Sequence, residues 1–67
     1  MIVKDFSERA LRTVLNSDGV CFRAGRFSVN LSANIPRIAK ELLNLYGESE
    51  VLSGPCDFNV KLQRAAG

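Results

Sequence analysis

Two cysteines, Cys21 and Cys56, are the side chains of this sequence with the greatest capacity for chemistry. They are 35 positions apart, they form no CxxC pair, and the 67 residues include no histidine. Zinc sites are built mainly from cysteine and histidine, so this composition nearly excludes one. The cysteines could form a disulfide, but we prefer two free, partly buried thiols, because that is the commoner state in the cytosol.

Catalysis by either cysteine is not expected. A nucleophilic thiol requires a neighbouring base or cation, whereas Cys56 is followed by Asp57, whose carboxylate disfavours the reactive thiolate. The chain also lacks the GxxxxGK-Ser/Thr stretch that surrounds phosphates in P-loop proteins. We therefore expect no enzyme activity and no cofactor site in this chain.

Length and composition indicate one small globular domain, residues 1–67. The chain is 46% hydrophobic and 24% charged, with a net charge of +2 that gives no strong signal for nucleic acid. No apolar run approaches the roughly 20 residues of a membrane span, and the N-terminus is charged within five residues, unlike a secretory signal. A cytoplasmic location without membrane contact is the expectation.

Hydrophobic periodicity predicts two helices. The first covers residues 5–15, with Asp5 as its N-cap and Glu8 in its first turn. The second begins at the sequence Asn34-Ile-Pro, with Asn34 as its N-cap, and ends at Gly47. We expect its late apolar residues to belong to the core first, and to an oligomer contact second. These residues are Leu42, Leu43, Leu45 and Tyr46.

Alternation of apolar and polar residues predicts three strands, at residues 20–23, 26–32 and 57–64. Gly25 allows a tight hairpin turn between the first two. The alternating apolar residues are expected to point inward, and the phenylalanines of all three strands to belong to the core. The inward residues of the second and third strands are Phe27, Val29, Leu31, Phe58, Val60 and Leu62.

The predicted fold class is α+β: a small three-stranded sheet with two helices, in the order helix-strand-strand-helix-strand. The helices would cover one face of the sheet. The connection through the second helix is long enough for a crossover, which would make the first strand antiparallel to both others.

The other face of the sheet would carry polar and basic side chains. We interpret it first as a solvated surface and second as a protein-contact face. Nucleic-acid binding is not expected, because stacking on bases would require aromatic side chains that the core is expected to use. The candidate contact residues are Arg23, Arg26, Asn30, Lys61 and Arg64.

Three stretches between Phe22 and Leu62 resemble a known family. They are FRAGRFSVNL from Phe22, the Ile35-Pro36 helix that ends in Leu-Tyr-Gly, and DFNVKL from Asp57. In order and spacing these stretches are similar to the N-terminal segment of the HPr kinase-related family, type A group, of bacterial P-loop serine kinases.

The resemblance implies a non-catalytic N-terminal accessory domain for docking or oligomerisation. The kinase domain, with its ATP and Mg²⁺, would lie beyond Gly67, so none of its catalytic residues transfers to this chain. The implied partners are that kinase domain, another protein, or a second copy in a homo-oligomer. The family's neighbours include PqqD-like peptide-recognition proteins, and the alternative is an independent small adaptor that binds a protein or peptide.

Overall fold

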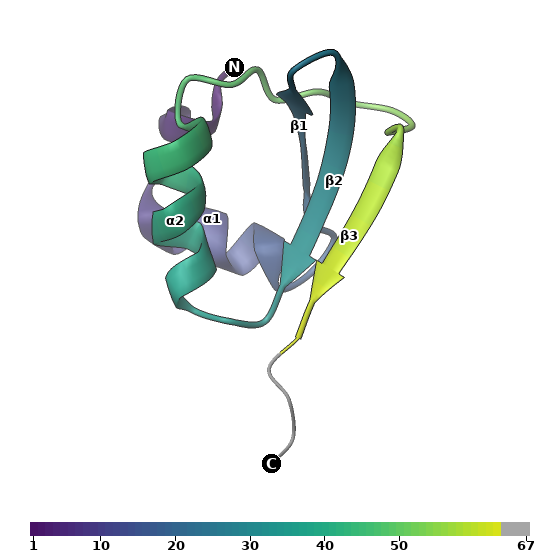
Figure 1. Cartoon of the computed structure of the whole chain (residues 1–67). Helices are drawn as coiled ribbons and strands as arrows, with labels where there is room; N and C mark the ends of the chain where they lie inside the picture. The colour runs from purple at the N-terminus through teal and green to yellow at the C-terminus, as the bar shows by residue number, and fades with distance from the viewer. Residues whose placement is uncertain (64–67) are drawn as a thin grey trace.

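The computed structural model describes residues 1–63, which form two layers, a sheet and a pair of helices on one side of it (Figure 1). A short 3-10 turn, η1 (Val3–Asp5), precedes helix α1 (Glu8–Leu15). Strands β1 (Val20–Ala24) and β2 (Phe27–Ala33) follow, then helix α2 (Arg37–Tyr46) and strand β3 (Phe58–Leu62). The predicted α+β class and element order are confirmed.

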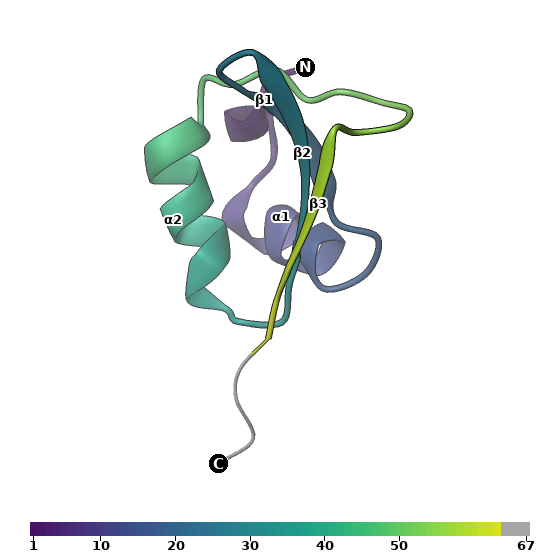
Figure 2. The ribbon, with the colours of Figure 1, turned by 45° about the vertical axis from the view of Figure 1, so that its right-hand side comes forward.

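The sheet is mixed, with the strand order β1-β2-β3. β1 and β2 are antiparallel, and Ala24 pairs with Phe27 across the turn, where Gly25 has a φ of +65°. That left-handed conformation costs glycine little. β3 is parallel to β2, as the predicted crossover through α2 requires. Both ribbon views place β3 at the margin of the sheet (Figure 2).

The opposite margin, beside β1, is closed by the segment from Glu50 to Leu52. The Arg23 N–H donates to the Glu50 carbonyl at 2.9 Å, and the Leu52 N–H donates to the Cys21 carbonyl at 2.8 Å. The N-terminus lies next to these residues, since the Val51 N–H donates to the Met1 carbonyl at 2.8 Å. The outer edge of β1 is therefore satisfied by the chain's own backbone.

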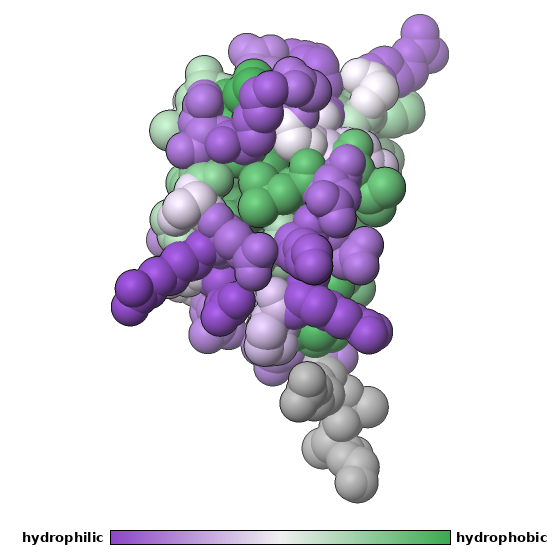
Figure 3. Space-filling view, turned by 90° about the vertical axis from the view of Figure 1, so that its left-hand side faces the viewer, coloured by the Kyte–Doolittle hydropathy of each residue, from purple (hydrophilic) through white to green (hydrophobic). Residues whose placement is uncertain are grey.

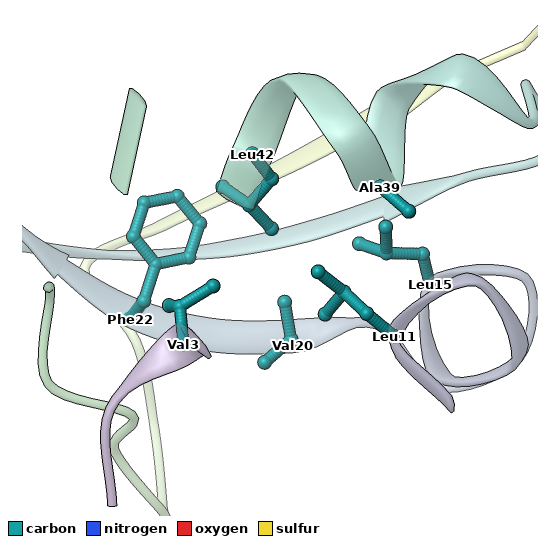
Figure 4. Close-up of a cluster of buried hydrophobic side chains, with 7 residues drawn as sticks. All are labelled: Val3, Leu11, Leu15, Val20, Phe22, Ala39 and Leu42. Carbon is teal, nitrogen blue, oxygen red and sulfur yellow. The ribbon is translucent and has the colours of Figure 1, made fainter. Parts of the chain in front are cut away.

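The core lies between the helices and the inner faces of β1 and β2. Its side chains come from η1, α1, β1 and α2 and converge on one another (Figure 4). Leu11 and Val3 are fully buried, and Phe22 is 4% exposed, which confirms the core position expected for that phenylalanine. Burying a side chain of this kind contributes roughly 1.5–3 kcal/mol. The buried cluster consists of Val3, Leu11, Leu15, Val20, Phe22, Ala39 and Leu42.

The first helix begins later than expected, and its N-cap is Ser7 rather than Asp5. The Ser7 hydroxyl accepts from the Ala10 N–H at 3.1 Å. The Asp5 carboxylate instead accepts from the Ile2 N–H at 2.8 Å, within the 3-10 turn. Phe6, just before the cap, packs against the cluster that contains Leu11, the arrangement known as a hydrophobic staple.

The second helix also begins later than predicted. Its N-cap is Pro36, which makes no side-chain cap hydrogen bond, so Asn34 does not hold the capping position. The Asn34 N–H donates instead to the Leu62 carbonyl at 3.3 Å, where β3 ends beside β2. This bond ties the start of the α2 connection to the edge strand.

Candidate protein-contact surface

β3 presents an apolar face that the helices cover only in part. The register pairs Phe58 with Val29 and Val60 with Leu31, so these β3 side chains share the helix side of the sheet. Phe58 is nevertheless 52% exposed and Val60 39% exposed. The apolar residues of β3 therefore point to the expected side of the sheet, but the expectation that they are buried in the core is wrong. α1 packs on α2 and β2, and α2 packs on α1 and η1, so the helix layer ends before β3.

The exposed face of β3 extends onto the start of β2 through an aromatic pair. Phe27, also expected in the core, is 46% exposed. Its ring meets that of Phe58 edge to face, with 5.4 Å between the ring centroids. We call the apolar surface formed by Phe27, Phe58, Val60 and Leu62 the β3 strip.

A shallow apolar groove of about 160 Å³ joins the β3 strip to α2. Leu45 is 72% exposed and Tyr46 40% exposed, which corrects the prediction that both belong to the core. Tyr46 packs on buried Phe22, with 5.1 Å between the ring centroids. Apolar side chains gather in the middle of the side on which α2 lies (Figure 3). The α2–β3 groove is lined by Phe22, Leu31, Ile38, Glu41, Leu42, Leu45, Tyr46 and Leu62.

The residues just before β3 hold its start to β2 and β1. The Ser28 N–H donates to the Asp57 carboxylate at 2.9 Å, and the Asp57 N–H donates to the Ser28 hydroxyl at 2.8 Å. One residue earlier, Cys56 forms a disulfide with Cys21 of β1. The expectation of free thiols is therefore wrong for both cysteines. The loop from Leu52 to Cys56 returns over β1 and brings the two Cα atoms within 6.5 Å, a separation typical of disulfides.

The candidate contact residues predicted from the sequence do not form one cluster. Arg23, Asn30 and Lys61 share the face away from the helices, but Arg23 pairs with Ser28 and Lys61 with Ser32. Two strand spacings and four residues of register separate these two cations by roughly 16 Å. Arg23 also forms an exposed ion pair with Glu50 at 3.6 Å.

Two of the candidates lie outside this face. Arg26 is exposed in the hairpin turn, and Arg64 lies outside the described residues. A role of the five residues in protein contact stays a prediction. The alternation in the sequence is a better signal for an exposed surface than these charges. The β3 strip consists of apolar positions of that alternation, and two helices are too few to cover all of them.

Two further polar features of the described residues are a hollow at the end of β2 and β3 and an exposed ion pair. Within residues 1–63 no group of three or more His, Cys, Asp or Glu side chains could hold a metal ion. A larger hollow of about 280 Å³ lies where β2 and β3 end, and Lys61 is the one charged side chain among its lining residues. Lys4 forms an exposed ion pair with Glu48, whose hydrogen bond raises the pKa of the lysine.

Comparison with family models, with curated proteins and with solved structures finds no match for this chain. In the described part, neither helix is long and apolar enough to cross a membrane.

Proposed function

We propose that this chain is a non-catalytic accessory domain that binds another protein through the β3 strip and the α2–β3 groove. The observation that carries the proposal is the exposure of β3, whose apolar face stands at the margin of the sheet with Phe58 52% exposed. Exposed apolar surface of this kind, next to polar surroundings, is typical of protein-interaction sites. A chain of 67 residues also gains from a partner, because a domain this small buries only about 60% of its unfolded surface.

The resemblance to HPr kinase-related proteins suggests the partner's class. We propose that the partner is the P-loop kinase domain of such a protein, that ATP and Mg²⁺ bind there alone, and that the complex is cytoplasmic. Because cytosolic reductants keep most thiols reduced, a cytoplasmic complex would expose the disulfide between Cys21 and Cys56 to reduction. The second candidate is an independent adaptor that binds a protein or peptide, which the open edge of β3 favours because an extended peptide can add to such an edge.

The test is a calorimetric titration of the 67-residue chain with the kinase domain of an HPr kinase-related type A protein. Leu45→Asp places a charge in the groove at a side chain that is 72% exposed, so the fold should tolerate it. If Leu45 is an anchor worth about 2 kcal/mol, the substitution weakens binding about 30-fold. Asn44→Asp adds the same charge on α2 outside the groove and should bind like the wild type.

Two results would contradict the proposal. If Leu45→Asp binds the kinase domain as tightly as Asn44→Asp, the groove is not the contact. ATP hydrolysis by the purified chain would disprove the non-catalytic part. Absence of kinase-domain binding, with retained binding of an extended apolar peptide, would favour the adaptor.

A further inference from the structure

We infer that a second copy of this chain pairs with the outer edge of β3, strand against strand and antiparallel, about a two-fold axis at Val60. This inference rests on the proposed function, because it names one partner of the same apolar surface. The pairing would join two three-stranded sheets into one of six strands, in the order β1-β2-β3 followed by β3-β2-β1 of the second copy.

The backbone of β3 has groups directed at the outer edge. The Leu62 carbonyl points toward β2, where it accepts from the Asn34 N–H at 3.3 Å. Successive residues of a strand direct their backbone groups to opposite sides, so those of Asn59 and Lys61 point outward. Among the described residues β2 is the one strand beside β3, and no strand meets these outward groups.

The side chains of β3 match their own reversed order. With the axis at Val60, Phe58 lies opposite Leu62 of the second copy, and Val60 lies opposite itself. Asn59 lies opposite Lys61, and these are the residues whose outward N–H and carbonyl groups can bond reciprocally. All five residues of the strand are paired, with apolar side chains meeting on one face and polar ones on the other.

The alternative registers oppose like charges, lose strand pairs or set apolar side chains against polar ones. An axis at Lys61 places two lysines directly opposite each other, which destabilises an antiparallel pair. An axis at Asn59 moves Leu62 opposite Cys56, which belongs to the loop and is held to β1 by the disulfide. A shift by one residue sets apolar side chains of one copy against polar ones of the other. The charge of Lys61 and the short length of β3 therefore select the register at Val60.

The same register brings the second copy to the α2–β3 groove. Leu62 lines that groove, so Phe58 of the second copy would lie at the groove's margin, near exposed Leu45. A standard interface buries about 800 Å² on each partner. That is about a sixth of the 4727 Å² surface of this chain. The strand pairing and the contact at the groove margin would together have to bury this area.

The oligomeric state of the oxidised chain, measured by sedimentation equilibrium from micromolar to millimolar concentration, tests the inference. The wild type should form a dimer. Val60→Lys sets two lysines against each other at the axis and should weaken dimerisation by at least about 30-fold. Asn44→Lys adds the same charge on α2, away from β3, and should dimerise normally. Circular dichroism of each variant checks that the fold is intact.

Cross-linking provides a second measurement that does not depend on weakening the strand. Opposed side chains of a non-hydrogen-bonded pair have Cβ atoms about 4.5–5.5 Å apart, so Val60→Cys should form an interchain disulfide readily. Asn59→Cys, which lies opposite Lys61 in this register, should cross-link much more slowly. Equal rates, or a wild type that remains monomeric throughout, would overturn the inference. A monomer that still binds the kinase domain through Leu45 would leave the proposed function standing.

Discussion

The disulfide between Cys21 and Cys56 should hold much of the stability of this small domain. The perturbation is its removal, either by a reductant or by the double substitution of both cysteines with alanine. The bond closes a loop with a sequence separation of 35, and it ties the loop before β3 to β1. After reduction, that loop keeps the hydrogen bond from the Leu52 N–H to the Cys21 carbonyl and the contacts between Ser28 and Asp57.

The expected loss follows from the loop length. In the chain-entropy model a loop of this size lowers the entropy of the unfolded chain by about 13 cal/mol/K, which is about 4 kcal/mol at 25 °C. Natural domains have roughly 0.05–0.15 kcal/mol of stability per residue, which is about 3–10 kcal/mol for a chain of this length. The reduced protein should therefore be marginal, with its Tm lower by roughly 15–30 °C.

The assay is urea unfolding followed by circular dichroism, with and without a thiol reductant. The double alanine variant is the control, because reductant should not change its unfolding. A loss below about 1 kcal/mol on reduction would refute the reasoning, since loop closure predicts several times that value. Mass spectrometry of the unreduced protein provides a direct check, because two alkylated thiols would show that the bond does not form.

Two further predictions concern the ends of helix α1. Ser7→Ala removes the hydroxyl that accepts from the Ala10 N–H and should cost about 1 kcal/mol in urea unfolding; a larger effect of Asp5→Ala would instead favour Asp5 as the cap. Gly19→Ala should destabilise by more than about 1 kcal/mol, because φ is +85° and a Cβ would lie 2.8 Å from the Leu31 carbonyl oxygen. Gly25→Ala, also at positive φ but with open space around it, should cost clearly less, and equal losses would show that the close contact is unimportant.

The order of helices and strands could be predicted because it depends on local patterns. The alternation from Phe27 to Leu31 and the helical spacing of Ala39 and Leu42 are present in the sequence itself, and the structure contains the corresponding elements. The start of the first helix could not be fixed from the sequence, because Asp5 and Ser7 are both good N-cap residues. The staple formed by Phe6 would have favoured Ser7.

The position of the exposed apolar surface could not be predicted in the same way. Alternation identifies which side chains of β3 share a face, but whether a helix covers that face depends on how α1 and α2 pack. Phe58 and Val60 therefore have a typical core pattern and an exposed position. The bond between Cys21 and Cys56 depends likewise on the path of the loop after Leu52, which no local pattern specifies.

The closed margin beside β1 limits what the open margin can build. The segment from Glu50 to Leu52 already occupies outward backbone groups of β1, so in the proposed pairing each copy has one open edge, that of β3. A molecule with one open edge stops at a dimer, whereas a molecule with two open edges can continue into a filament. In the proposed dimer, the bonds of Glu50 and Leu52 to β1 would therefore prevent further strand addition, so that the open edge of β3 does not lead to polymers.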